Sequence, residues 1–204
     1  MELHHTVIEA FTVRERAALA LADDAGAVAD ACHDMAVRFH RGGKLIVFGN
    51  GGASTDAGHI AVEFVHPVIV GKRALPAMAL TNDPATMTGV ANRAGFAETF
   101  AHQVRYFADP NDIALGVSCD GDCANVLRGL AVAHDVGLLT VALVGAGHRG
   151  DGGRIAAAAG KIAVVDHVLI ARAIDPAVVK EIHVTMYHVL WELVHVFFEQ
   201  PGVL

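Results

Sequence analysis

His59 and Glu63 are the pair of side chains in this sequence most suited to chemistry. They stand four residues apart, so they share one face of any helix that contains them. An imidazole and a carboxylate held together can transfer protons or bind a divalent metal. Glu63 lies among apolar neighbours, where an unpaired buried carboxylate is costly. This context favours a functional role for Glu63 over a packing role.

A glycine-rich segment precedes this pair. The apolar run at residues 45–48 predicts a buried strand, residues 49–52 a tight turn, and Ser54 or Thr55 a helix N-cap. Such an order directs free backbone N–H groups toward one point, as in sites for phosphorylated small molecules. The alternative is a glycine-rich connection ahead of a core-packed helix, and the glycines alone do not decide between the two.

The composition indicates a globular α/β chain. Its 204 residues are 53% hydrophobic and carry a formal charge of −7, which fits one domain with a substantial core. The negative charge and the lack of a basic run argue against a nucleic-acid partner. Without a leader pattern or a long apolar run, we expect a soluble cytoplasmic protein with no membrane partner. Three cysteines without CxxC spacing argue against a disulfide framework.

The elements that must position the pair follow from hydrophobic periodicity. Residues 6–41 have a helical pattern broken near residues 23–26, which predicts two helices or one kinked helix. The last element is a long helix from Pro176 to about Glu199. Between them, five apolar segments alternate with helix-compatible stretches, which predicts a parallel sheet covered on both faces. The predicted strands are residues 44–48, 76–80, 113–118, 138–144 and 161–165.

Open parallel sheets bind ligands outside the carboxyl ends of their strands. The loops that follow Phe48, Leu80 and Ser118 are therefore the candidate site loops.

These loops and helices together resemble the SIS (sugar isomerase) domain proteins, and among them the bacterial phosphoheptose isomerases. The resemblance covers nearly the whole chain. It rests on the two N-terminal helices, the FGNGG turn at 48–52, Asp56, His59 with Glu63, Ala91-Asn92 with Gly95-Phe96, the segment from Ser118 to Asn125, and Glu181-Ile-His183 leading to His188.

The resemblance implies a three-layer α/β/α fold with a five-stranded, flavodoxin-like parallel sheet, an N-terminal helical pair and a long C-terminal helix. It implies a single SIS domain over residues 1–204, with helices in 1–42 used in oligomerisation and an α/β core in 43–204. Similar enzymes convert sedoheptulose 7-phosphate to a heptose 7-phosphate as homotetramers with sites at subunit interfaces. We therefore expect a homo-oligomer and a sugar-phosphate ligand, and no nucleotide cofactor.

The same resemblance assigns catalytic roles. Moving a carbonyl between two carbons through an enediol needs a base for the carbon-bound proton and a group for the oxygen protons. Glu63 matches the base of the family and His188 its acid partner; a core histidine on an amphipathic helix is the alternative for His188. The implied substrate-binding residues are Asn50, Gly51, Gly52, Ser54, Asn92, Arg93, Ser118, Cys119, Asp120, Cys123 and Lys180.

The loop at residues 118–123 departs from the family, which typically has Ser-Thr-Ser-Gly-Asn-Ser there. Cys119 and Cys123 replace hydroxyls with weak donors; the start of a helix could lower their thiol pKa values, or they could simply pack. Asp120 would cost on the order of 1 to 4 kcal/mol beside a phosphate charge about 4 Å away. Ala53 stands where a serine is usual, and Arg93 where an acid is usual. Arg93 could offset Asp120, or it could be a solvated surface residue.

Some family members bind zinc with His, Glu, Gln and His, which correspond to His59, Glu63, Lys180 and His188 here. A protonated lysine cannot ligate a metal. Either zinc has three protein ligands, His59, Glu63 and His188, or the Lys180 ammonium takes the place of the metal and pairs with Glu63.

Three functions are therefore open. The first is an aldose-ketose isomerase of a sugar phosphate, supported by Glu63 and His188. The second is a non-catalytic SIS protein that binds a carbohydrate derivative or a protein partner, supported by the altered loop. The third is an isomerase for a substrate with a neutral or cationic far end, recognised by Asp120 and Asp122.

Overall fold

The chain forms one five-stranded parallel sheet. The computed structural model describes residues 2–147, 150–161, 164–200 and 202. The strand order is β2-β1-β3-β4-β5, with every neighbouring pair parallel, which is the flavodoxin-like order. The strands are β1 Leu45–Gly49, β2 Ala77–Ala79, β3 Ile113–Ser118, β4 Leu139–Gly145 and β5 His167–Ala171.

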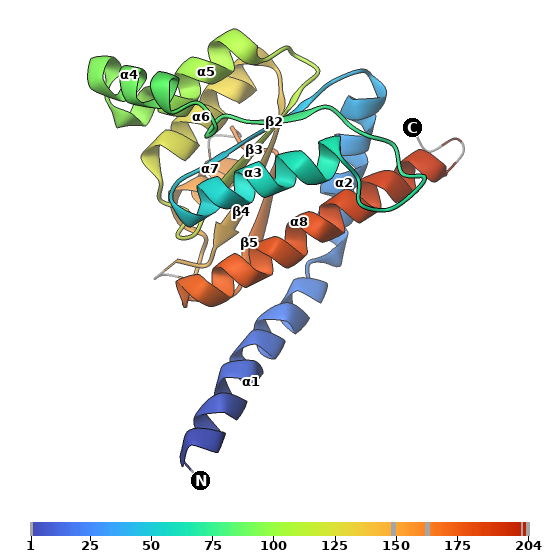
Figure 1. Cartoon of the computed structure of the whole chain (residues 1–204), viewed down its shortest axis with the longest axis vertical. Coiled ribbons are helices and arrows are strands. Elements are labelled where there is room, and N and C mark those ends of the chain that lie inside the picture. Colours follow the sequence, from blue (N-terminus) through green and yellow to red (C-terminus); the bar gives the residue numbers. More distant parts are fainter. Residues whose placement is uncertain (1, 148–149, 162–163, 201, 203–204) are drawn as a thin grey trace.

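Helices cover both faces of the sheet, which confirms the expected three-layer architecture. α2, α3 and α8 pack on one face, and α5, α6 and α7 on the other; α3 and α8 lie side by side in front of the sheet in Figure 1. The helices are α1 Glu2–Ala22, α2 Ala25–His40, α3 Gly52–Val65, α4 Pro84–Ala94, the 3₁₀ turn η1 Phe96–Glu98, α5 Thr99–Phe107, α6 Ala124–Val136, α7 Gly153–Lys161 and α8 Pro176–Glu199.

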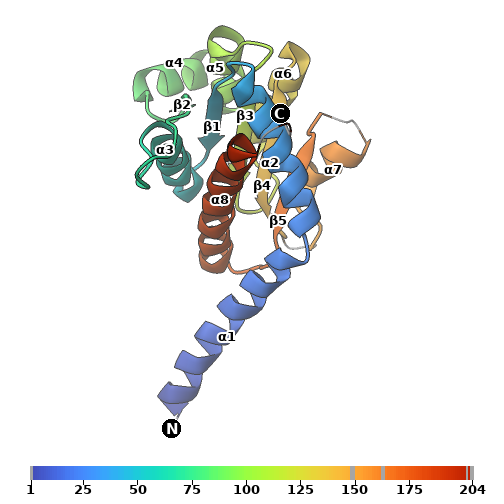
Figure 2. The ribbon, with the colours of Figure 1, turned by 90° about the vertical axis from the view of Figure 1, so that its right-hand side faces the viewer.

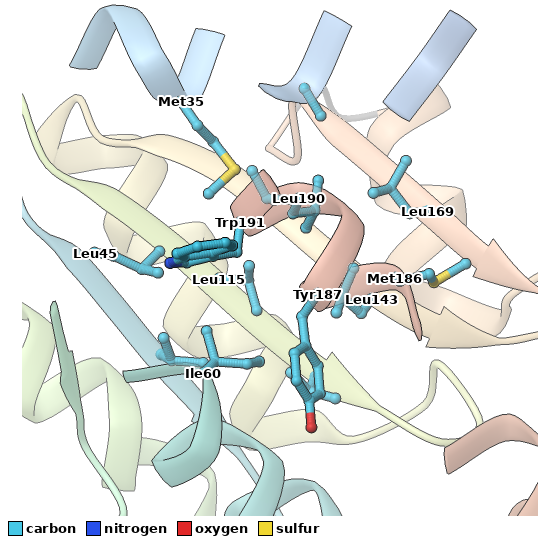
Figure 3. Close-up of a cluster of buried hydrophobic side chains, with 14 of the residues drawn as sticks. Met35, Leu45, Ile60, Leu115, Leu143, Leu169, Met186, Tyr187, Leu190 and Trp191 are labelled. Carbon is cyan, nitrogen blue, oxygen red and sulfur yellow. The ribbon is translucent and has the colours of Figure 1, made fainter. Parts of the chain in front are cut away.

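The central strands are apolar throughout because both of their faces are buried. In β1, Leu45 and Val47 point into the core beneath α2, α3 and α8, whereas Ile46 and Phe48 point into the core beneath α5 and α6. Figure 3 shows part of the first core, where Trp191 and Leu190 of α8 meet Leu115 of β3.

The N-terminal segment forms two helices, as its interrupted pattern predicts. The break falls at residues 23–24, where both oxygens of Asp24 accept hydrogen bonds from Arg172, at 2.7 and 2.9 Å. α2 packs against α8, whereas α1 extends away from the body of the molecule in both views (Figures 1 and 2). The Arg14 Nε atom of α1 pairs with Glu181 of α8 at 2.7 Å.

The long C-terminal helix also lies where the sequence predicts it. Asp175 caps α8 by accepting the Ala177 N–H at 2.9 Å, and Pro176 occupies the first turn, where its missing N–H costs nothing. None of the described helices is both long enough and apolar enough to cross a membrane.

The prediction of the fifth strand is wrong. The strand is His167–Ala171 and not residues 161–165, of which 162–163 lie outside the described residues. Asp166 separates two adjacent apolar runs, and its carboxylate accepts from the Thr140 N–H and hydroxyl, both at 2.8 Å. These hydrogen bonds place the run after Asp166, and not the run before it, in register with β4, where His167 pairs with Val141. Val165 is buried in the core ahead of the strand.

Burial of His183 in α8 predicts a pH-dependent stability. Its side chain is fully buried, and desolvation lowers its pKa below the ordinary value of 6.5. Below about 6.5 the unfolded chain takes up a proton that the folded chain refuses, so the free energy of unfolding falls as the pH drops. In His183→Gln this loss between about pH 7.5 and about pH 5.5 becomes smaller, as measured by urea unfolding at each pH.

His40, exposed at the end of α2, provides the matched control. His40→Gln keeps the pH dependence of the wild type. An equal pH dependence in His183→Gln and in the wild type would contradict the assignment.

Candidate active site

Three side chains from opposite ends of the chain meet between α3 and α8. The ligand-capable atoms of His59, Glu63 and His188 all lie within 4.8 Å of one another. His59 Nε2 is 3.1 Å from Glu63 Oε1, and the two imidazole rings meet edge to face, with centroids 5.5 Å apart. The fold thus brings together the pair that the spacing picks out and the distant histidine that the resemblance adds.

Helix packing explains this meeting. α3 buries Ala57, Ile60 and Phe64, and α8 buries Met186 and Leu190 in the same core. The site side chains lie beside these buried faces. The Glu63 side chain is 15% exposed and that of His59 is 44% exposed, so the site opens at the surface of the single chain.

Tyr187 holds the far side of the His59 ring. Its hydroxyl is 2.7 Å from His59 Nδ1, while its ring is only 1% exposed. Figure 3 shows this hydroxyl pointing away from the other labelled core side chains. Burial raises the pKa of Tyr187 to about 12, with the charges of Asp56 and Glu63 adding to the effect, so the phenol stays protonated. When the Tyr187 hydroxyl donates to Nδ1, the proton of the ring is on Nε2 and can be donated to Glu63; when Nδ1–H donates to the Tyr187 oxygen, the Nε2 lone pair is available to a metal ion.

The sequence analysis missed Tyr187. The only sequence feature that could have indicated a role for Tyr187 is its position next to the candidate histidine His188 on a helix. Many core tyrosines have such a position. The contact with His59 spans 128 positions of the chain, which no local spacing reveals.

Lys180 does not pair with Glu63. Its Nζ donates to Asp56 Oδ1 at 2.5 Å and to the Gly52 carbonyl oxygen at 3.0 Å. The Asp56 carboxylate is buried and needs a cation nearby, whereas Glu63 already faces His59. The idea that the Lys180 ammonium replaces a metal beside Glu63 is therefore wrong. Lys180 instead ties α8 to the first turn of α3.

The glycine turn starts α3 three or four residues earlier than predicted. Gly51, with φ of +55°, is the N-cap in place of Ser54 or Thr55. The Ala53 and Ser54 N–H groups donate to Asn50 and Gly51 carbonyl oxygens, both at 3.0 Å, which closes the first turn. A positive φ is accessible to glycine at low cost, and this allows the tight turn directly after β1.

An amide pair joins the two candidate loops. Asn50 Nδ2 donates to Asn125 Oδ1 at 2.7 Å, and Asn125 Nδ2 donates back to Asn50 Oδ1 at 2.9 Å. This pair bridges the carboxyl ends of β1 and β3, the point of the flavodoxin-like sheet where the strand order reverses and ligands bind. The glycine loop and the loop that follows Ser118 therefore start next to each other at the carboxyl edge of the sheet.

The loop at residues 118–123 is folded around Asp120. Ser118 is buried, and its hydroxyl donates to Asp120 Oδ1 at 3.0 Å. Burial and the nearby charge of Asp56 raise the pKa of Cys119, opposite to the lowering expected from a helix dipole. This thiol is not activated.

Asn92 and Arg93 lie on α4, and both are exposed. Arg93 lines a shallow pocket with Thr86, Val90 and His102. No hydrogen bond or ion pair joins Arg93 to Asp120, both of which lie in the described part of the chain. Among the described residues, neither Asn92 nor Arg93 has a hydrogen bond or ion pair to His59, Glu63 or His188.

The cluster has the donor set of a metal site. Two imidazoles and one carboxylate are ligands that suit zinc, and three protein ligands leave a position open for water or substrate. The same carboxylate and imidazole could also carry protons between neighbouring substrate atoms.

Known proteins share both the sequence and the fold. The phosphoheptose isomerase of Solidesulfovibrio magneticus is 39% identical over 178 residues, 87% of this chain and 82% of that protein. The phosphoheptose isomerase structure from Francisella tularensis superposes with a TM-score of 0.85 at 29% identity, covering 96% of this chain and 100% of that one. The one from Neisseria gonorrhoeae gives 0.83 at 28% identity, covering 94% and 98%. The SIS domain model matches residues 11–145, and the chain belongs to the SIS domain family.

Proposed function

We propose that this protein is a phosphoheptose isomerase-like enzyme, an aldose-ketose isomerase acting on sedoheptulose 7-phosphate or a related sugar phosphate. The observation that carries the proposal is the meeting of His59, Glu63 and His188 within 4.8 Å. The extent of the similarity to phosphoheptose isomerases, over 87% of the chain, supports the same reaction class.

In this proposal Glu63 takes the proton from the carbon next to the carbonyl and returns it to the neighbouring carbon. His188 exchanges protons with the two substrate oxygens, which interchange as hydroxyl and carbonyl. Glu63 is mostly buried, so its carboxylate is shielded from bulk water at the moment of transfer. His59 holds the carboxylate in place through its Nε2 contact at 3.1 Å.

We also propose that His59, Glu63 and His188 hold a zinc ion. The contact between His59 Nδ1 and the Tyr187 hydroxyl supports this assignment, because metal-binding histidines commonly donate their second ring N–H to a fixed acceptor, here the Tyr187 oxygen. When bound, the ion would polarise the substrate carbonyl. A carboxylate has two oxygens, so Glu63 could hold the zinc ion with one oxygen and still accept the substrate proton with the other.

The far end of the sugar would lie between the two loops. The proposed binding residues there are Asn50, Gly51, Gly52 and Ser54 on one side, and Ser118, Cys119, Asp120 and Cys123 on the other. From Gly52 to His59 the helix rises about 10 Å, so a ligand reaching both ends must be an extended sugar with its phosphate remote from the carbonyl. Lys180 borders this path, and Asn92 and Arg93 are proposed to contact the substrate from α4.

The altered loop favours a second candidate function, a non-catalytic SIS protein that binds a carbohydrate derivative or a protein partner. The Asp120 carboxylate occupies donors that a phosphate would need. The assay below separates the two candidates.

We further propose a homotetramer assembled through the helices in residues 1–42, within a single domain of 204 residues. Ile8, Phe11 and Leu19 of α1 recur at helical spacing and are at least half exposed. Val62 and Val65 add apolar surface on α3 beside the site. Burying these faces against other copies would also cover the site. Three free cysteines support a reducing compartment such as the cytoplasm.

The first test is the conversion of sedoheptulose 7-phosphate by wild type and by Glu63→Gln. The substitution keeps the shape but removes the base, so kcat falls by about a hundredfold to ten-thousandfold. Exchange of the carbon-bound hydrogen with deuterated water, followed by NMR, disappears with it.

Glu192→Gln, an exposed position on the same helix as His188, keeps the wild-type rate. A folded wild type that converts no ketose phosphate would reject the enzyme proposal and favour the binding protein.

The second test is metal binding. Protein purified without chelator or metal-affinity tag contains one zinc per chain by element analysis. Tyr187→Phe loses only the hydroxyl that orients His59, and its zinc affinity falls by about tenfold or more in competition with a chromophoric chelator.

Tyr106→Phe is the control, because Tyr106 is the other tyrosine of the chain and is exposed. A wild type that binds no zinc would reject the metal site, and unchanged zinc affinity in Tyr187→Phe would remove the role of Tyr187.

The third test concerns assembly. Phe11 is 72% exposed on the apolar face of α1, and Phe11→Lys places a charge in the proposed interface. Light scattering then finds a species smaller than the tetramer. Glu9→Lys, one position away from Ile8 and so turned by about 100° around the helix, leaves the tetramer intact. A wild-type monomer would refute the assembly.

A further inference from the structure

The loop at residues 118–123 places several hydrogen-bond donors around one point. The Ser118 hydroxyl, the Asp122 backbone N–H and the Cys123 thiol all approach Asp120 Oδ1, at 3.0, 2.9 and 3.8 Å. Converging hydroxyl and backbone N–H donors are what a phosphate group needs. Here a carboxylate of the chain itself already fills the position.

These donors are committed to the carboxylate. Ser118 Oγ accepts the Gly121 N–H at 3.0 Å, so its own proton remains for Asp120. The hydrogen bond from the Asp122 backbone N–H contributes most to lowering the pKa of Asp120 below its usual range. The carboxylate is therefore ionised at neutral pH and holds a charge at this point.

The backbone of the loop has little room to adapt. Gly121 has φ of +73°, and a Cβ there would lie 1.8 Å from the Gly152 carbonyl oxygen, so the two backbone segments are in close contact. The Asp122 carboxylate accepts from the Arg154 N–H at 3.0 Å, which anchors the loop again. The exposed Asp120 side chain, not the backbone, must move when a ligand enters.

The basic side chains that contact these loops are already paired. Lys180 pairs with Asp56 and Arg154 with Asp122, at 2.5 and 3.3 Å. Neither cation is therefore available to neutralise the negative charges of Asp120 and an incoming phosphate.

We infer that Asp120 is an internal anion that competes with the phosphate of the substrate for the donors of this loop, and so determines how strongly the site binds phosphorylated sugars. A phosphate binds only when the Asp120 side chain rotates out, and it then meets that negative charge close by. The inference rests on the proposed function for the identity of the ligand. It makes Asp120 a specificity-determining residue that lowers the preference for a phosphorylated over an unphosphorylated sugar.

The test measures binding of inorganic phosphate and of sedoheptulose 7-phosphate by calorimetry. Asp120→Ser frees the donors and binds both ligands at least tenfold more tightly than the wild type does. Asp120→Asn removes the charge but leaves an acceptor in place, and it gives a smaller gain. Asp135→Asn is the matched control: it removes the same charge near the other end of α6, where the side chain is 73% exposed, and changes affinity less than threefold.

Kinetics provide a second readout. In Asp120→Ser the KM for sedoheptulose 7-phosphate falls by about tenfold while kcat changes less than threefold, and the KM for unphosphorylated sedoheptulose is unchanged. A gain in affinity cannot arise from misfolding. Equal or weaker phosphate binding in Asp120→Ser, or a gain of the same size in Asp135→Asn, overturns the inference, as does the absence of phosphate binding in every variant.

The two proposals fail separately. Tighter phosphate binding in Asp120→Ser, with no isomerisation by the wild type, would retain the role of Asp120 and reject the enzyme. Isomerisation that depends on Glu63, with phosphate affinity insensitive to Asp120, would do the reverse.

Discussion

The ion pair between Lys180 and the buried Asp56 connects the two helices on which the site depends. A buried carboxylate without a cation would be strongly destabilising, so the pair fixes where α8 crosses the first turn of α3. Seven residues beyond Gly52 lies His59, and eight beyond Lys180 lies His188. Because both helices are rigid, fixing their starts also sets the distance between these two imidazoles. A lysine is compatible with this role, although it cannot ligate a metal.

Different interactions hold the two ends of the site, the chemical end at His59, Glu63 and His188 and the binding end at the two loops. The chemical end depends on helix packing, with Tyr187 joining the core of α8 to His59 through one hydrogen bond. The binding end depends on loop backbone, held by the Asn50 and Asn125 amide pair and by glycines at close approaches. Since different contacts hold each end, substitutions such as Asp120 can alter ligand preference without disturbing Glu63.

The hydrophobic pattern predicted most of the fold, whereas the site residues came from the spacing of His59 and Glu63 and from the family resemblance. The strand at residues 113–118 and the helix from Pro176 were found because buried runs and caps are local signals. The fifth strand was misplaced because two apolar runs flank Asp166, and only its bonds to Thr140 choose between them. The partners of Lys180 and Tyr187 could not be found, because each lies more than 120 positions away.

Exposure of the site in the single chain has a chemical consequence. Proton transfer from carbon needs a base that is shielded from water. Water competes for the hydrogen bonds of the base and weakens the electrostatic interactions between the base, the substrate and the neighbouring side chains. The Glu63 side chain is already shielded by its own helices, whereas that of His59 is 44% exposed. The apolar surface at Val62 and Val65 lies on the same helix as both residues. If other copies cover that surface as well as the apolar face of α1, assembly buries apolar area and also shields the site, so the proposed chemistry depends on the proposed tetramer.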